Sequence, residues 1–112
     1  MHVTRIADAK PYETKGHFDM VALRLQGFEA SPSTFAWTGL SHFLPGGGAE
    51  SSASDIEEIY VVFSGEVTII TDEGETALGA LDNCWLAAGE RREIVNRTNE
   101  VATMLVMMPY PA

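Results

Sequence analysis

The feature that most constrains the fold of this chain is a succession of short apolar, β-branched runs, each ended by turn-forming residues. Helical periodicity is weak throughout, whereas such runs between glycine, proline, aspartate and asparagine are typical of strands. Eight short strands at this spacing predict an all-β sandwich or barrel of the jelly-roll kind. The predicted strands are 18–26, 34–44, 56–63, 66–71, 76–78, 84–87, 92–96 and 101–108.

Two local signals concern the ends of these strands. Pro45–Gly48 predicts the end of the second strand, because proline removes a donor from the ladder and glycine frees the backbone for a turn. Ser54–Glu57 has the spacing of a helix capping box. The residues that follow, Ile59–Phe63, are β-branched and aromatic, which favours a pleated strand. We therefore predict a strand there.

Length and charge narrow the class of protein. The chain has 112 residues, which predicts one domain over 1–112. Its net charge of −9 repels phosphate backbones and anionic lipid, so we expect neither nucleic acid nor a membrane as partner. The one cysteine, Cys84, can form no internal disulfide, and no apolar stretch is long enough to span a bilayer. We expect a cytoplasmic protein in which Cys84 is a core residue.

With these strands, the chain resembles the cupin family. The first motif of that family is a glycine, a His-x-His pair, a glutamate and a closing glycine. Gly46, Glu58 and Gly65 match it at the right spacing, while the two histidine positions fall on Ser52 and Ser54.

The second motif of the family is matched in part. Gly89 and Asn96 agree with it, Leu81 and Ala87 replace a glycine and a proline, and Arg92 takes the histidine position. The matching stretch covers residues 46–96. The resemblance implies a small, single-domain, RmlC-like jelly roll, or double-stranded β-helix.

Family members hold a catalytic metal with three histidines and the glutamate, and here only Glu58 is left. Serine hydroxyls are weak ligands at neutral pH. The guanidinium of Arg92 offers only donors and repels a divalent ion. The resemblance therefore implies a pocket that works with no metal and no other cofactor.

Because the ligand positions of the family converge inside the barrel, we expect Glu58 and Arg92 to form a buried salt bridge in place of the ion. Two interpretations stay open. The pair either plugs a vestigial site, or presents the donors of Arg92 to a carboxylate or carbonyl of a ligand that Glu58 orients. A shift of this strand's register by one residue would place Arg91 in the pocket instead of Arg92.

Other side chains are candidates for the pocket. Tyr60 lies two residues after Glu58 and so shares its face, where it can act as a donor, as an acid or as a packing residue. His42 is a candidate general base near the end of a strand, and a surface position is the alternative. Ser52 and Ser54 are expected as small polar residues beside the ligand.

The remaining notable residues are interpreted structurally. His17–Asp19 is expected at an interface between two copies, because N-terminal strands of the family often extend a sheet across a homodimer, and a catalytic role is the alternative. Trp37, Trp85 and Met104–Met108 are expected in the core or in an apolar pocket wall.

Two functions follow as hypotheses. In the first, the protein is a metal-independent isomerase, lyase or cyclase. It acts on a small carboxylate- or carbonyl-bearing metabolite, with Arg92 steadying an oxyanion and His42, Tyr60 or Glu58 moving the proton. In the second, it binds or senses a small ligand without turnover. The first requires His42 or Tyr60 to face the same cavity as Arg92.

Overall fold

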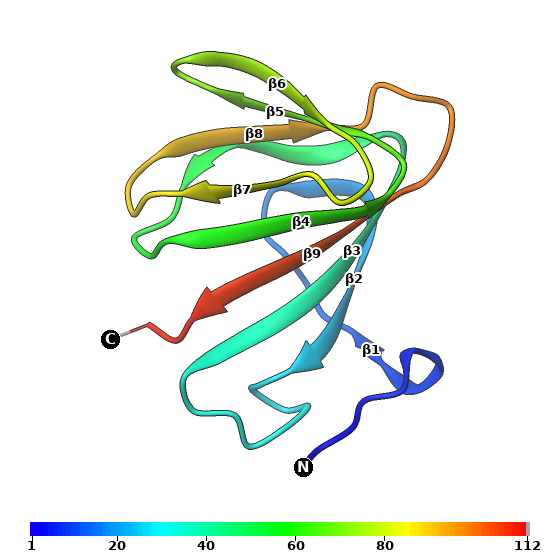
Figure 1. The fold of residues 1–112 in the computed structure, drawn as a ribbon, viewed down its shortest axis with the longest axis vertical. Helices are drawn as coiled ribbons and strands as arrows, with labels where there is room; N and C mark the ends of the chain where they lie inside the picture. The colour runs from blue at the N-terminus through cyan, green and yellow to red at the C-terminus, as the bar shows by residue number, and fades with distance from the viewer. Residues whose placement is uncertain (112) are drawn as a thin grey trace.

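The structure is a computed structural model that describes residues 1–111. It contains one short helix and nine strands in a barrel that is open at one end (Figure 1). The predicted all-β jelly roll is confirmed. The elements are a 3₁₀ helix η1 (Ile6–Asp8), β1 (Lys10–Pro11), β2 (His17–Gln26), β3 (Ala36–Ala53), β4 (Glu58–Ser64), β5 (Val67–Thr71), β6 (Gly74–Leu78), β7 (Asn83–Leu86), β8 (Arg91–Val95) and β9 (Ala102–Pro109).

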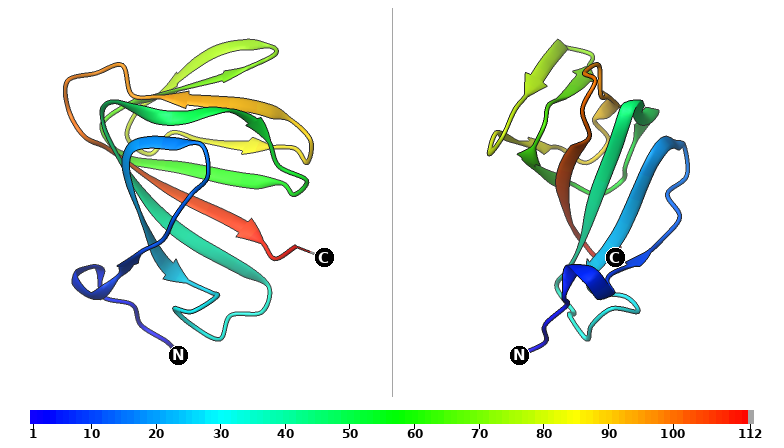
Figure 2. Two further views of the ribbon diagram at one scale, coloured as in Figure 1. Left: turned by 180° about the vertical axis from the view of Figure 1, so that it is seen from behind. Right: turned by 90° about the vertical axis from the view of Figure 1, so that its right-hand side faces the viewer.

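All neighbouring strands pair antiparallel, in the order β6-β5-β8-β3-β9-β4-β7, with β2 also on β3 and β1 on β2. Figure 2 shows the same barrel from behind and edge-on, with the N-terminal segment beside β2 at the lower end. The strand predicted at Ile59–Phe63 is confirmed as the body of β4. Within residues 1–111, no helix has the length and apolarity needed to cross a membrane.

Strand β3 differs from the prediction, because it continues through the proline and glycines to Ala53. Its first half pairs with β9 and its second half with β8, so the bend at the glycines carries β3 from one neighbouring strand to the other. A Cβ at Gly47 or Gly48 would overlap the carbonyl oxygen of Asp19 or Ile94. The glycines thus allow close passage of neighbouring backbones and do not end the strand.

Asn96, the asparagine of the second family motif, holds this bend. Its side chain is fully buried, and its Nδ2 donates to the Phe43 carbonyl at 3.0 Å and the Glu100 carbonyl at 2.7 Å. The backbone N–H of Gly46 donates to the Asn96 carbonyl, and the Asn96 N–H donates to the Gly47 carbonyl, each at 2.8 Å. The motif residue therefore fixes the position of β3 against β8.

The inward-facing side chains divide the barrel into two regions. One region is a packed core that draws on both sheets and includes Phe43, Val62, Ile69, Ile94 and Met104. The other region, toward the open end, contains the polar side chains of β4 and β8. Strand alternation places these polar residues in the same interior, because Glu58, Tyr60 and Val62 all point inward from β4.

Candidate functional site

A cavity of about 180 Å³ lies inside the barrel beside the packed core. Its charged and titratable lining residues are Tyr12, His17, Glu58, Tyr60 and Arg92. They come from the segment before β2, from the first residue of β2, from β4 and from β8, so the cavity collects residues that lie far apart in the chain. Apolar side chains, Trp37 among them, complete the wall. A small enclosed space with a few polar groups has the character of a ligand site.

Three of these side chains form a hydrogen-bonded chain across the interior. The hydroxyl of Tyr60 donates to Glu58 Oε2 at 3.0 Å, and Arg92 Nε donates to the Tyr60 hydroxyl oxygen at 2.9 Å. All three are buried, with exposed fractions of 8%, 2% and 9% for Glu58, Tyr60 and Arg92. The two charges are therefore joined by a phenol that gives one hydrogen bond and receives another.

The direct salt bridge expected between Glu58 and Arg92 is not formed. The ion pairs of residues 1–111 are Arg24–Glu29 and Arg97–Glu75. The physical reason is the size of Tyr60, which shares the inward face of β4 with Glu58 and places its hydroxyl between the carboxylate and the guanidinium. The expectation that Tyr60 shares the face of Glu58 is confirmed, while the direct contact predicted between Glu58 and Arg92 was wrong.

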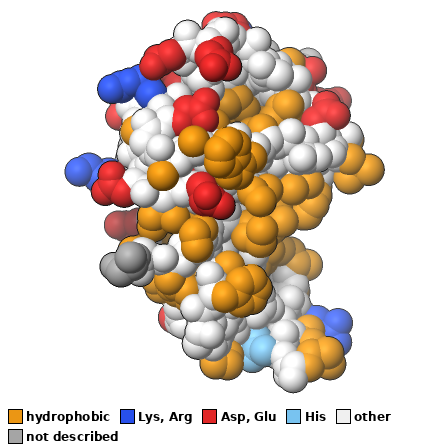
Figure 3. All heavy atoms as spheres, turned by 60° about the vertical axis from the view of Figure 1, so that its left-hand side comes forward, with side chains coloured by type: hydrophobic (Ala, Val, Ile, Leu, Met, Phe, Trp, Pro, Cys, Tyr) orange, Lys and Arg blue, Asp and Glu red, His pale blue; other side chains and the backbone are white. Residues whose placement is uncertain are grey.

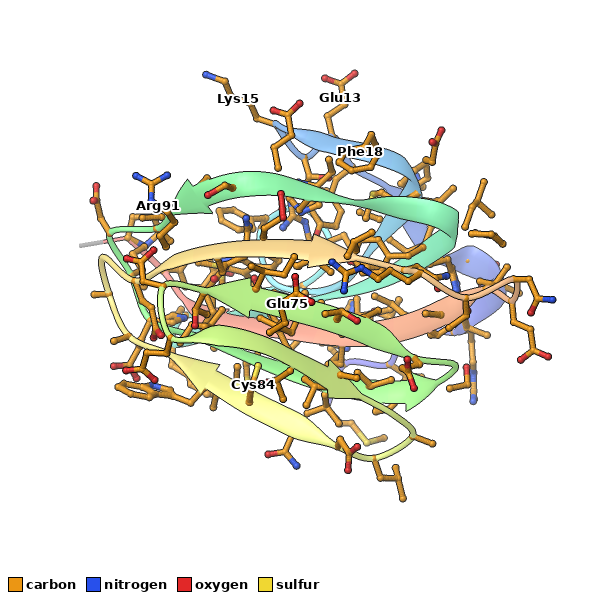
Figure 4. All side chains as sticks on the ribbon, turned by 90° about the horizontal axis from the view of Figure 1, so that it is seen from above. Glu13, Lys15, Phe18, Glu75, Cys84 and Arg91 are labelled. Atoms are coloured by element: carbon orange, nitrogen blue, oxygen red, sulfur yellow. The ribbon has the colours of Figure 1, made fainter. Side chains whose placement is uncertain are left out.

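The rest of the Arg92 guanidinium is held from β3. Its Nη1 donates to Ser52 Oγ at 2.9 Å and to the Glu50 carbonyl at 3.2 Å. Nη2 makes no hydrogen bond to residues 1–111. Since every fully buried side-chain nitrogen or oxygen in that range has a hydrogen-bond partner, Nη2 is not fully buried. Nη2 is therefore open to a ligand. The neighbouring Arg91 is exposed and lies on the outside of the barrel (Figure 4), which settles the register in favour of Arg92.

The environment of Tyr60 favours its protonated form. Burial raises the pKa of Tyr60 well above its usual range, Glu58 adds to this, and Arg92 opposes it. Because a phenol in this state keeps its proton, Tyr60 is a donor that orients Glu58 and is a poor general base at neutral pH.

His17 is a cavity residue that the sequence analysis placed at an interface. Its Nδ1 donates to the Lys15 carbonyl at 3.1 Å, so the lone pair of the neutral ring is on Nε2. Burial lowers the pKa of His17, and the positive charge of Arg92 lowers it further, while the bond to Lys15 opposes this. A neutral imidazole with a free lone pair is a candidate base. No sequence motif marks it.

His17 reaches the cavity because the segment before β2 folds back across the barrel. The N–H of Tyr12 donates to the Ala22 carbonyl at 2.9 Å, and the N–H of Glu50 donates to the Gly16 carbonyl at 2.8 Å. In Figure 4, Glu13 and Lys15 point outward from this segment. Tyr12 and Thr14 line the cavity from this segment, and His17 lines it from the start of β2.

His42 lies away from the cavity. Its neighbours Ser41 and Phe43 line the cavity, so alternation turns His42 to the outer face of β3, where Nδ1 lies 2.9 Å from Thr103 Oγ1. Ser54 Oγ accepts from the Ile56 N–H within its own turn and is not a lining residue. Of the residues predicted for the site, Glu58, Tyr60, Arg92 and Ser52 come together, while His42 and Ser54 do not.

No protein-family model matches this sequence. A protein of Mycobacterium tuberculosis named as a beta-D-galactosidase is 42% identical to it over 111 residues, which is 99% of this chain and 96% of that protein. A polyketide cyclase of Streptomyces resistomycificus has the same fold, with a TM-score of 0.87, 17% identity, and coverage of 97% of this chain and 79% of the other. A sugar phosphate isomerase from the cupin superfamily of Silicibacter pomeroyi has a TM-score of 0.74 and 25% identity, over 83% of this chain and 60% of that one.

The chain belongs to the cupin superfamily. In this cupin, the positions that hold a metal in the family do not fit a divalent ion. Ser52 Oγ accepts a hydrogen bond from Arg92, Ser54 Oγ is engaged in its turn, and Arg92 places a cation at the third position. Among residues 1–111, no three His, Cys, Asp or Glu side chains are grouped to hold an ion. Glu58 alone is a suitable ligand.

Proposed function

We propose that this cupin binds the galactosyl group of a small β-galactoside in the barrel cavity and cleaves the glycosidic bond without a metal. The observation that carries the proposal is the buried chain Glu58–Tyr60–Arg92 beside the neutral imidazole of His17. The 42% identity to a named beta-D-galactosidase over nearly the whole chain supports the choice of substrate. The relative from the cupin superfamily that is named a sugar phosphate isomerase supports a sugar ligand.

The size and the polarity of the cavity suit one sugar ring. Its volume of about 180 Å³ is below the roughly 300–1,000 Å³ of pockets for drug-sized ligands, so the part of a ligand held inside is small. Trp37 and Tyr12 offer aromatic faces to the C–H groups of a sugar, and Arg92 Nη2 offers N–H donors to its hydroxyl oxygens. The alcohol portion of the galactoside would extend through the open end.

The chemistry follows from two groups. Glycoside hydrolysis builds positive charge at the anomeric carbon, and the carboxylate of Glu58, held by the Tyr60 hydroxyl, stabilises that charge. The lone pair on Nε2 of His17 accepts a proton from the attacking water, and this proton is returned to the departing alcohol oxygen. The anomeric carbon keeps the hydroxyl of the water, so the products are galactose and the alcohol.

The test is hydrolysis of a nitrophenyl β-D-galactoside by the purified chain after treatment with a chelator, with elemental analysis to establish the metal content. Glu58→Gln should lower kcat/KM by about 10²–10³-fold, and His17→Asn should also lower it. The matched control is Glu57→Gln, because Glu57 is the exposed residue just before β4, and its substitution should change kcat/KM by less than about twofold.

Two results would contradict the proposal. Equal activity in Glu58→Gln and in the unmodified chain would mean that a contaminating enzyme or another site is responsible. Activity that follows the metal content and disappears with the chelator would mean that the cavity chemistry is metal-dependent. Binding of galactose by calorimetry without hydrolysis would support the alternative of a non-catalytic binding protein.

A second candidate function is favoured by Arg92 Nη2, which is open to a carboxylate or carbonyl oxygen. In that case, the cavity binds a small metabolite that carries such a group and isomerises, cyclises or cleaves it by proton transfer. Calorimetric titration with small carboxylic acids distinguishes the two, because Arg92→Met should abolish binding of a carboxylate and weaken binding of galactose only in part.

A further inference from the structure

A second hollow, of about 360 Å³, lies between the N-terminal segment and β2, away from the barrel interior. The segment is held in place by side chains on both sides. Thr4 Oγ1 donates to the Leu25 carbonyl at 2.6 Å, and Gln26 Nε2 donates to Thr4 Oγ1 at 3.3 Å. The hollow is therefore a built feature of the fold, with walls that come from residues 2–10 and from β2 with the turn after it.

The lining of this hollow is positive in an acidic protein. Arg5, Lys10 and Arg24 contribute three of the seven Lys and Arg side chains of the chain, against the two carboxylates Asp8 and Glu29. Three positive and two negative charges leave +1, while the whole chain carries −9. In Figure 3, the acidic side chains of one face gather in its upper part, where cationic side chains also lie, and a histidine and a cationic side chain lie at the lower, N-terminal end. The net positive lining of the hollow attracts an anion, although the chain as a whole is acidic.

Arg24 is the central cation. Its guanidinium carbon lies 3.8 Å from the ring centroid of Tyr12, 4.5 Å from that of Phe28 and 4.9 Å from that of Trp37. Its Nε contacts Glu29 Oε1 at 3.3 Å, and its side chain is 13% exposed. The terminal nitrogens of Arg24 make no hydrogen bond to residues 1–111. Since every fully buried side-chain nitrogen of that range has a partner, these two nitrogens are not fully buried, and Arg24 lines the hollow.

Because the Arg24 guanidinium packs against aromatic rings and its Nε meets Glu29, its two terminal nitrogens are the donors left for a ligand, and guanidinium N–H groups bind oxyanions bidentately. We infer that the hollow is a second binding site, for a small organic molecule that carries a phosphate or carboxylate group. The oxyanion binds the edge of Arg24, and Arg5 and Lys10 add attraction from the N-terminal side. The volume exceeds what a bare phosphate fills, so the hollow has room for an organic body attached to the oxyanion.

This site is separate from the proposed catalytic cavity, but the two share a wall. Tyr12 and Trp37 line the barrel cavity, and they also stack on Arg24. Their rings contact each other edge to face, with centroids 6.0 Å apart. An anion on Arg24 therefore changes the environment of Trp37, which supplies a signal that does not depend on catalysis.

The experiment uses the fluorescence of Trp37. Trp85→Phe leaves Trp37 as the single tryptophan, and Trp85 is exposed, so this background should fold. The chain is titrated with inorganic phosphate in one arm and with succinate in the other, at constant ionic strength. A saturable change in the emission of Trp37 is expected in at least one arm. Whichever of phosphate and succinate has the lower apparent Kd identifies the class of oxyanion.

Variants locate the site. Arg5→Ser and Lys10→Ser change exposed side chains, and each should weaken binding about threefold to tenfold, while Arg24→Lys, which loses the planar fork, should weaken it by at least about tenfold. The control is Arg97→Ser, which removes the same charge from an exposed residue that binds Glu75 elsewhere. Its apparent Kd should stay within about twofold.

Three results would overturn the inference. No saturable response in either arm would mean that the hollow binds no such oxyanion. A response that Arg5→Ser and Lys10→Ser leave unchanged would place the anion in the barrel cavity beside Arg92. If Arg97→Ser weakened anion binding as much as Arg5→Ser and Lys10→Ser, the variants would act only through the net charge of the chain. Because none of these readouts requires turnover, they stand apart from the test of galactoside cleavage.

Discussion

At the scale of single residues, the hydroxyl of Tyr60 connects two buried charges. Tyr60→Phe removes the donor to Glu58 and the acceptor of Arg92 Nε without changing the ring. Because each buried partner then lacks a hydrogen bond, the free energy of unfolding should fall by about 1–3 kcal/mol, measured by urea denaturation. Tyr12→Phe, with no hydrogen bond from its hydroxyl among residues 1–111, should cost less. An equal cost for both would contradict the role given to Tyr60.

His17 predicts a dependence of stability on pH. Its pKa is lowered in the folded protein because burial and Arg92 disfavour the imidazolium, so the unfolded chain binds the proton more readily. The free energy of unfolding should therefore fall as the pH is lowered from about 7 toward 5, below the ordinary histidine pKa of about 6.5.

His17→Asn should remove this component and flatten the dependence, measured by urea denaturation at several pH values. His2→Asn is the control, because His2 is exposed. The interpretation is wrong if His2→Asn and His17→Asn flatten the curve to the same extent.

At the scale of elements, the bend of β3 holds the two sheets together. A Cβ at Gly48 would overlap the Ile94 carbonyl of β8, whereas a Cβ at Gly46 meets nothing within 4 Å and is disfavoured only by its φ of +83°. Gly48→Ala should therefore cost at least about 3 kcal/mol of unfolding free energy, and Gly46→Ala about 1–2 kcal/mol. Urea denaturation measures both.

Gly48→Ala should also affect the candidate site. Arg92 lies two residues before Ile94 on β8, so displacement of β8 moves the guanidinium relative to Tyr60. Gly48→Ala should then lower ligand affinity or activity more than Gly46→Ala does. A larger loss of stability in Gly46→Ala would mean that the close approach of β3 and β8 is not what the glycine provides.

At the scale of the whole molecule, one apolar row crosses the outer face of strands β2, β3, β9 and β4. It contains Leu23, Leu40, Leu105 and Val61, of which Leu40 is buried and the other three are partly exposed. Beside this row, Val21 is 47% exposed. We propose that a second copy of the chain covers this face in a homodimer, because no charged side chain stands in that row although each copy carries −9.

Val21→Glu should shift the mass measured by light scattering after size exclusion from dimer toward monomer, because it buries a charge in the interface. Val101→Glu is a matched control, since Val101 is equally exposed, at 46%, but lies in the loop before β9. A monomer in the unmodified chain, or the same shift with both variants, would contradict the proposal.

The local pattern of this sequence was enough to predict the all-β jelly roll, the position of β4 and the shared face of Glu58 and Tyr60, while the resemblance to the cupin family implied that Glu58 and Arg92 point inward. Alternation along a strand and the spacing of Gly46, Glu58, Gly65 and Asn96 are properties of residues near one another in the chain, so a reader of the sequence can find them. The exposed Arg91 and the buried Arg92 agree with this pattern.

Only the tertiary structure decided which groups touch. The hydroxyl of Tyr60 lies between Glu58 and Arg92 because side chains from β4 and β8 meet across the barrel. His17 reaches the cavity because the segment before it folds back onto β2 and β3, and β3 passes its glycines because β8 lies against them. These contacts join residues that are distant in the chain, so the local periodicity of the sequence does not predict them.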